Sequence, residues 1–265
     1  MKLIDIHTDL SNMDCHLHSR FSPDARGAGA DEPQKIADVV RARGLRGFIV
    51  TDHIDVGHWL NDPPFDFDGY FKAWEKVRRD NPDLTVYIGL EVGFEDEHAE
   101  ETAKLIKDLP LEYVINSIHY WKRDAAFDKN GNLVGNEWAN GRVVAYTKYL
   151  EAVLASLDAP YPFSTIGHLG FPERYAPYPV GEREMEYELF KPLLDKIIEK
   201  AVALGVRFEE NTNANGEMRL PREAFLRAYK AAGGVRPVIG SDAHLSAAIG
   251  QYFDKAERFL DGIFG

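Results

Sequence analysis

Histidine and acidic side chains recur in this chain at spacings that suit metal binding or proton transfer. The stretch DCHLHSRFSPDA places His16 and His18 two residues apart and Asp24 six residues later. Residues i and i+2 of a strand face the same way, so His16 and His18 can bind one ion together. Cys15 is the only cysteine, which excludes an internal disulfide, and we expect it to be a small buried residue facing away from both histidines. By itself the stretch fits a metal site, a proton-transfer site or a polar loop.

The same residue types follow most of the apolar segments of the chain. Each of seven predicted strands begins apolar and ends in a group that can bind metal or phosphate. These groups are His16 and His18, Asp52 and His53, Glu91, His119, His168, Asn211, and Asp242 and His244. A lone histidine is usually a surface or core residue, but six that share one placement indicate a common site. His7, His58 and His98 lack this placement, and we expect no ligand role for them.

The elements that must position these groups alternate along the chain between strand and helix patterns. Predicted strands cover residues 13–18, 47–53, 85–93, 113–120, 164–170, 206–212 and 236–244. Amphipathic helical patterns cover residues 33–44, 95–109, 141–157, 184–205 and 221–234. This alternation predicts an α/β fold with parallel strands joined by crossover helices. In a parallel barrel the carboxyl ends of all strands meet at one face, where active sites lie.

Two longer segments carry no clear pattern, residues 55–69 and 122–140. Loops of this length are often functional lids or rims, although a plain surface excursion fits equally well. No Pro-, Ser- or Gly-rich linker divides the chain, so we expect one domain over residues 1–265.

Bulk composition limits the classes of function. The 265 residues are 45% hydrophobic and 28% charged, which is typical of a globular α/β protein. A formal net charge of −12 does not favour a nucleic-acid partner. No apolar run approaches the roughly 18 to 20 residues that cross a bilayer, and MKLIDIHTDL has no signal core. We therefore expect a cytoplasmic enzyme without a membrane partner; the sequence does not indicate its oligomeric state.

The chemistry of the converging groups predicts a metal centre. Six imidazoles with Glu91, Asp242 and Asp24 suit borderline divalent cations such as zinc, manganese or iron. About nine ligands are too many for one ion, so we expect two to three ions that share carboxylates.

The motifs DCHLHSRFSPDA, FIVTDH, GLEVGF, NSIHY, IGHLG and IGSDAH, in this order, resemble the polymerase and histidinol phosphatase (PHP) superfamily of metal-dependent phosphoesterases. The resemblance implies a distorted (β/α)7 TIM-like barrel with a trinuclear centre. It implies one ion on His16, His18, Glu91 and Asp242, a second on Glu91, His119 and His168, and a third on Asp24, His53 and His244. Asp52 would then orient a ligand, or alternatively cap a helix.

Within the superfamily, the opening motif and the chain length are most similar to the histidinol-phosphate phosphatases. That similarity implies that the substrate is L-histidinol phosphate, a small phosphate ester held by two arginines that match Arg174 and Arg219; Arg20 is a weaker match. It also implies a catalytic role for Asp242 or His244 in protonating the leaving group. The histidinol-phosphate phosphatases carry a Tyr-Pro pair shortly after the second arginine, whereas this chain reads RLPREAFLRAYK, so this segment is not typical of them.

The implied reaction is hydrolysis of a phosphate monoester by water activated between metal ions. Three alternatives remain: a PHP-type enzyme for another phosphate ester or a diester, an amidohydrolase-type metal hydrolase, and a domain without activity. The middle strands offer Glu91 and His119 but no lysine that could be carboxylated, which disfavours the amidohydrolase. All nine expected ligands are present, which disfavours a domain that has lost its activity.

Overall fold

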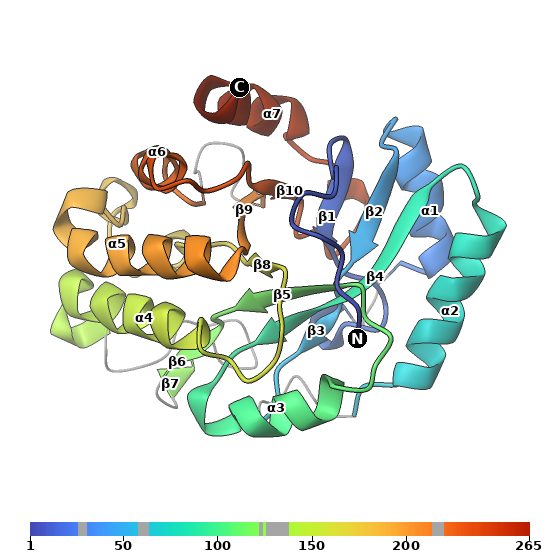
Figure 1. The fold of residues 1–265 in the computed structure, drawn as a ribbon, viewed down its shortest axis with the longest axis horizontal. Coiled ribbons are helices and arrows are strands. Elements are labelled where there is room, and N and C mark those ends of the chain that lie inside the picture. Colours follow the sequence, from blue (N-terminus) through green and yellow to red (C-terminus); the bar gives the residue numbers. More distant parts are fainter. Residues whose placement is uncertain (26–30, 58–63, 122–123, 126–137, 214–219) are drawn as a thin grey trace.

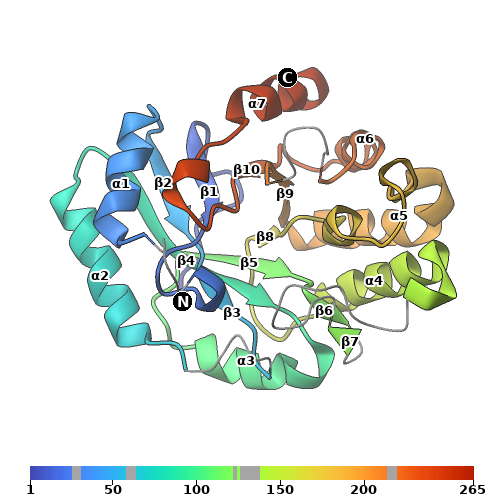
Figure 2. The ribbon, with the colours of Figure 1, turned by 180° about the vertical axis from the view of Figure 1, so that it is seen from behind.

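The strands form one parallel sheet that helices surround on the outside (Figures 1 and 2). The computed structural model describes residues 1–25, 31–57, 64–121, 124–125, 138–213 and 220–265. The strands of the main sheet are β1 (Met13–Leu17), β2 (Gly47–Val50), β3 (His53–Ile54), β4 (Thr85–Gly93), β5 (Tyr113–Ser117), β8 (Thr165–Ile166), β9 (Arg207–Asn211) and β10 (Val238–Gly240). Their order is β1-β2-β4-β5-β8-β9-β10, with β3 paired to β4. A short antiparallel pair, β6 (Tyr120–Trp121) and β7 (Asp124–Ala125), lies outside it.

The first and last strands of the sheet meet and close it. Leu17 forms a parallel bridge with Ala243, just beyond β10. The backbone N–H of His18 donates to the carbonyl of Ala243 at 2.9 Å, and the N–H of Asp242 donates to the carbonyl of His16 at 2.8 Å. The seven predicted strands and the barrel are therefore confirmed. The closing bonds involve residues of the predicted metal site itself.

One predicted strand, residues 47–53, is broken into β2 and β3. At the break, the backbone N–H of Thr51 donates to the carbonyl of Leu17 at 2.9 Å. Strand β2 pairs with both β1 and β4, and β3 continues the pairing with β4 in the same register, which places His53 opposite Glu91. The register with β4 thus brings this predicted ligand beside the centre of the site.

Strand β1 is also irregular. Between Asp14 and Leu17 it advances three residues while β2 advances two, from Phe48 to Val50. The extra residue lets Cys15 and His16 face the barrel interior together. Cys15 is fully buried in a cluster with apolar residues of β2 and β5. Its burial was predicted correctly, but its orientation away from His16 was wrong because a bulge interrupts the alternation of the strand.

Helices cover the outer face of the sheet (Figure 1). They are α1 (Pro33–Ala42), α2 (Phe67–Asp80), α3 (Ala99–Ile106), α4 (Arg142–Ser156), α5 (Tyr187–Leu204), α6 (Glu223–Ala231) and α7 (Phe253–Phe264). Five of them match predicted helical patterns. No helix in the described part of the chain is long and apolar enough to span a bilayer.

Helices α2 and α7 were not predicted. Residues 67–69, assigned to an irregular segment, form the first turn of α2, and the Asp66 side chain caps this helix by accepting from the Gly69 N–H at 2.9 Å. Its buried residues recur at helical spacing, as do those of α7; they are Tyr70, Trp74 and Val77 in α2, and Phe253, Ala256, Leu260 and Ile263 in α7. The remaining parts of both irregular segments lie largely outside the described residues.

Tyr70 links α2 to the sheet, because its buried hydroxyl donates to the carbonyl of Gly89 at 2.6 Å. We expect Tyr70→Phe to lower the free energy of unfolding by about 1 kcal/mol, since a buried acceptor loses its donor. Denaturant unfolding measures the change. Tyr252→Phe, at an exposed position, is the control and should have no effect. Equal stability of the two variants would contradict the role of this bond.

Candidate metal centre

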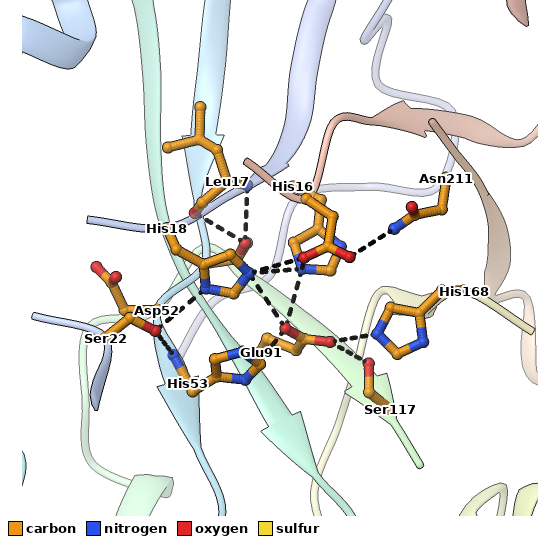
Figure 3. A network of polar contacts seen from close by, with 12 residues as sticks. His16, Leu17, His18, Ser22, Asp52, His53, Glu91, Ser117, His168 and Asn211 are labelled. Carbon is orange, nitrogen blue, oxygen red and sulfur yellow. Dashed lines mark hydrogen bonds and ion pairs between the residues drawn. The ribbon is translucent and has the colours of Figure 1, made fainter. Parts of the chain in front are cut away.

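The buried carboxylate of Glu91, in β4, lies at the centre of the site, with imidazole rings from several strands turned towards it (Figure 3). Its Oε1 is 2.8 Å from His168 Nε2 and 3.1 Å from His119 Nε2. Its Oε2 is 2.9 Å from His16 Nε2 and 3.5 Å from His18 Nε2. The structure thus places Glu91 between two groups of histidines, as a bridging ligand would be.

A third group adjoins the first two. Asp24 Oδ2 lies 2.8 Å from His244 Nε2 and 3.3 Å from His53 Nε2. The other ring nitrogen of His53 is 3.2 Å from Glu91 Oε2. These residues come from a short helical turn after β1, from β3 and from the loop after β10, so three separate segments meet here.

Asp242 connects the histidines of the cluster to an arginine. Its Oδ1 lies 3.3 Å from His18 Nε2, and its Oδ2 accepts from Arg174 Nη1 at 3.1 Å. Arg174 also donates to the side-chain oxygen of Asn211, at the end of β9. Asp242 has a left-handed backbone, with φ of 50°, directly after β10. The chain turns sharply there, and the Asp242 N–H stays bonded to β1.

The structure brings together all nine predicted ligands and Arg174. Arg219, the second predicted arginine, lies outside the described residues. Arg20 pairs with Glu32 at 2.9 Å and is half-exposed. His7 and His98 belong to none of the groups of potential ligands in the described ranges, and His58 lies outside those ranges.

Sequence reasoning missed three supporting side chains and left the role of a fourth open. Asp55 Oδ1 lies 2.8 Å from His119 Nδ1, and Glu209 Oε1 lies 2.7 Å from His16 Nδ1. Ser117 Oγ donates to Glu91 Oε1 at 2.7 Å. Asp52, which was expected to orient a ligand or cap a helix, accepts from the N–H and hydroxyl of Ser19 at 2.6 and 2.7 Å. It therefore fixes the segment that follows His18.

One signal could have found two of these residues. Asp55 and Glu209 each lie two residues from a strand-end polar group, His53 and Asn211, and so face the same side.

The charges of the cluster are strongly coupled. Burial alone would raise the pKa of Glu91, but His16, His53 and His119 outweigh it and hold this pKa well below its ordinary value. Burial, assisted by His244 and His53, lowers the pKa of His18 to about 3. Burial also opposes protonation of His53, yet Asp24 and Glu91 outweigh it and raise the pKa of His53 to about 9. The buried carboxylates and imidazoles of the cluster therefore shift one another's pKa.

The donor set fits divalent cations. Four groups each contain three potential ligand atoms that lie within 4.8 Å of one another. The groups are His18/His53/His244, His16/His18/Glu91, His53/Asp55/His119 and Glu91/His119/His168. The Nε2 atoms of His16 and His18 face each other at 3.1 Å, which suits a cation that both rings bind. Nitrogen and carboxylate ligands in this ratio suit zinc, manganese or iron.

A groove of about 350 Å³ lies at the opposite end of the barrel, where β9 and β10 begin. Arg207 and Val238 line it together with residues 6–11, and none of the predicted ligands does. The polar cluster is therefore confined to the carboxyl-terminal face, as predicted for a parallel barrel.

Comparison with known proteins places this fold and site in a family. The family model of the PHP domain matches residues 14–213. A probable histidinol-phosphatase of Clostridium acetobutylicum is 26% identical over 251 residues, which cover 94% of this chain and 92% of that protein. A histidinol-phosphatase of Lactococcus lactis subsp. lactis is 25% identical and covers 89% of this chain and 86% of its own length.

A solved structure shares the fold. It is histidinol phosphate phosphatase from Lactococcus lactis, complexed with zinc, L-histidinol and phosphate, with a TM-score of 0.84 at 22% identity over 97% of this chain and 95% of that one. The chain belongs to the PHP domain family, so the resemblance seen in its motifs is confirmed.

Metal affinity should depend steeply on pH. His53 has a pKa of about 9 in the metal-free protein, so its ring carries a proton at pH 7 that a metal ion must displace. We expect zinc affinity to rise from pH 6.5 to 8.5, by up to about tenfold per pH unit for each proton released. Competition with a chelator measures it. Equal affinities at pH 6.5 and 8.5 would contradict the protonated state assigned to His53.

Proposed function

We propose that this chain is a metal-dependent phosphatase that hydrolyses histidinol phosphate to histidinol and phosphate. The observation that carries the proposal is the cluster of potential metal ligands gathered around Glu91, beside an arginine, at the carboxyl-terminal face of a barrel. The curated relatives named above span nearly the whole chain and support the choice of substrate. The zinc, histidinol and phosphate bound by the Lactococcus protein support both the proposed metal dependence and the proposed substrate.

The proposed ligands are those of the three groups. His16, His18, Glu91 and Asp242 would hold one ion, Glu91, His119 and His168 a second, and Asp24, His53 and His244 a third. When bound, such ions activate water and neutralise the charge of a phosphoryl group. A pair or a trio of ions fits the same residues.

The chain's own residues would bind and orient the ester. Arg174 is only 6% exposed and is held by Asp242 and Asn211, which aims a rigid fork of donors at the site. This fork matches two phosphoryl oxygens and stabilises the charge that develops on them. Arg219 is proposed for the same task.

Protonation of the leaving alcohol is assigned to Asp242 or His244. His244 is the more accessible of the two, with 32% of its side chain exposed. Its Nδ1 is 3.0 Å from the Asp242 carbonyl, and its Nε2 faces Asp24, so its ring is fixed at the edge of the cluster.

A second candidate substrate is another small phosphate ester. The observation behind it is the segment at residues 219–230, which lacks the Tyr-Pro pair typical of histidinol-phosphate phosphatases. The net charge of −12 disfavours nucleic acid, and a cytoplasmic location remains part of the proposal.

Phosphate release is the direct test. Purified protein with quantified metal is assayed on L-histidinol phosphate beside sugar phosphates, nucleotides and a chromogenic diester. We expect two to three ions per chain and the highest kcat/KM on histidinol phosphate. Bound metal with preferred hydrolysis of another ester would keep the metal centre and reject the substrate. No metal uptake and no activity with added zinc, manganese or iron would reject both.

Arg174→Ala should lower kcat/KM by about a hundredfold, since one donor to the transition state is lost, and Arg174→Lys should recover only part of it. Metal content is measured beside activity, because Arg174 also donates to the proposed ligand Asp242. Arg227→Ala, which removes an exposed arginine paired with Glu223, is the control. Full activity of the Arg174→Ala variant would refute the assigned role.

A further inference from the structure

Three glycines at the strand ends of the site each lie against a supporting side chain. A Cβ atom at Gly240 would lie 2.2 Å from Glu209 Oε1 and 2.5 Å from His16 Cβ. A Cβ atom at Gly167 would lie 2.2 Å from Ser117 Oγ, and one at Gly93 only 1.7 Å from Asp55 Oδ1. None of the three has a positive φ, so backbone conformation does not require glycine there. The space is needed by the neighbouring side chains.

We propose that Glu209 is a positioning residue that holds the His16 ring in the tautomer required for metal binding. We also propose that residue 240 is glycine because Glu209 and His16 occupy the space that a larger side chain would need. The proposal rests on the metal centre proposed above. Asp55 beside His119, with Gly93, is a second pair of the same construction.

Glu209 is fully buried, and its contacts join three strands. Its Oε1 lies 2.7 Å from His16 Nδ1 and accepts from Asn211 Nδ2 at 3.1 Å. Its Oε2 accepts from the backbone N–H of His168 at 2.8 Å. One carboxylate therefore orients a proposed ligand of the first ion by its ring and a proposed ligand of the second ion by its backbone.

The contact with Glu209 decides which nitrogen of His16 can bind a metal. An ionised carboxylate can only accept, so the His16 proton is held on Nδ1. Nε2 is then the nitrogen that faces Glu91 Oε2, 2.9 Å away, and His18 Nε2, 3.1 Å away, and a metal ion bound there would replace the proton that Nε2 shares with Glu91. Carboxylates that hold the distal nitrogen of a ligand histidine typically contribute 10- to 100-fold to metal affinity.

The Glu209→Gln variant preserves the shape of the side chain but removes the carboxylate that holds the His16 proton on Nδ1. If the amide nitrogen replaces Oε1, its N–H faces the donor Asn211 Nδ2. It also donates to His16 Nδ1, so the His16 proton must lie on Nε2, where it blocks the metal. If the amide nitrogen replaces Oε2, it opposes the His168 N–H. Either orientation sets a donor against a donor.

The test measures zinc binding by chelator competition, with stoichiometry, and the unfolding free energy of each metal-free protein. We expect Glu209→Gln to weaken at least one zinc equivalent by about 10- to 100-fold. The Gly240→Ala variant should weaken zinc binding to a similar extent. Glu210→Gln is the matched control, since it is the adjacent buried glutamate and faces the other side of β9. Gly262→Ala, where a Cβ meets nothing within 4 Å, is the control for glycine.

The outcomes separate this proposal from the function. If the wild type binds no zinc, the proposed metal centre fails. If the wild type binds zinc and Glu209→Gln binds it equally well, only the role of Glu209 fails. If Glu209→Gln does not fold, a long-range ¹H–¹⁵N spectrum of the zinc-loaded wild type decides: a proton on His16 Nδ1 is expected, and zinc on that nitrogen would overturn the proposal.

Discussion

The negative charge of Glu91 in the closed interior of the barrel is the constraint on which the rest of the site depends. A buried carboxylate is costly unless hydrogen bonds and opposite charges surround it. Here five imidazoles, from β1, from β3 and from the segments that follow β1, β5 and β8, supply those partners together with Ser117. Because the partners come from segments far apart in the chain, these strands must pair before the charge is compensated.

Irregular backbone brings the ligands within reach of that charge. The bulge in β1 returns His16 and His18 to the interior after Cys15, while the register of β2 and β3 with β4 places His53 opposite Glu91. The left-handed backbone of Asp242 turns its carboxylate back over β1. A regular β1 without the bulge would have turned His16 and His18 away from Glu91.

The alternation of strand and helix was sufficient to predict parallel strands, and the resemblance to the PHP superfamily implied the barrel. Eight of the nine side chains that the structure brings together were named from their position at strand ends, and Asp24 was named from the opening motif. These signals were sufficient because the alternation of strand and helix and the end of an apolar run are local. The orientation of Cys15 was wrong because a bulge depends on pairing with β2, which the order of residues does not reveal. Glu209 was missed because its spacing from Asn211 shows only which side of the strand it faces, and its partner His16 lies 193 positions away in the sequence. Helix α2 was missed because it follows a segment without periodicity.

The closing bridge between Leu17 and Ala243 has a consequence for biosynthesis. His16 and His18 leave the ribosome early, whereas Asp242 and His244 are translated more than two hundred residues later. A nascent chain thus holds His16 and His18 without their partner Asp242 until the segment after β10 has emerged. Truncated translation products would lack a complete metal-binding set, so an interrupted synthesis yields no partly active hydrolase.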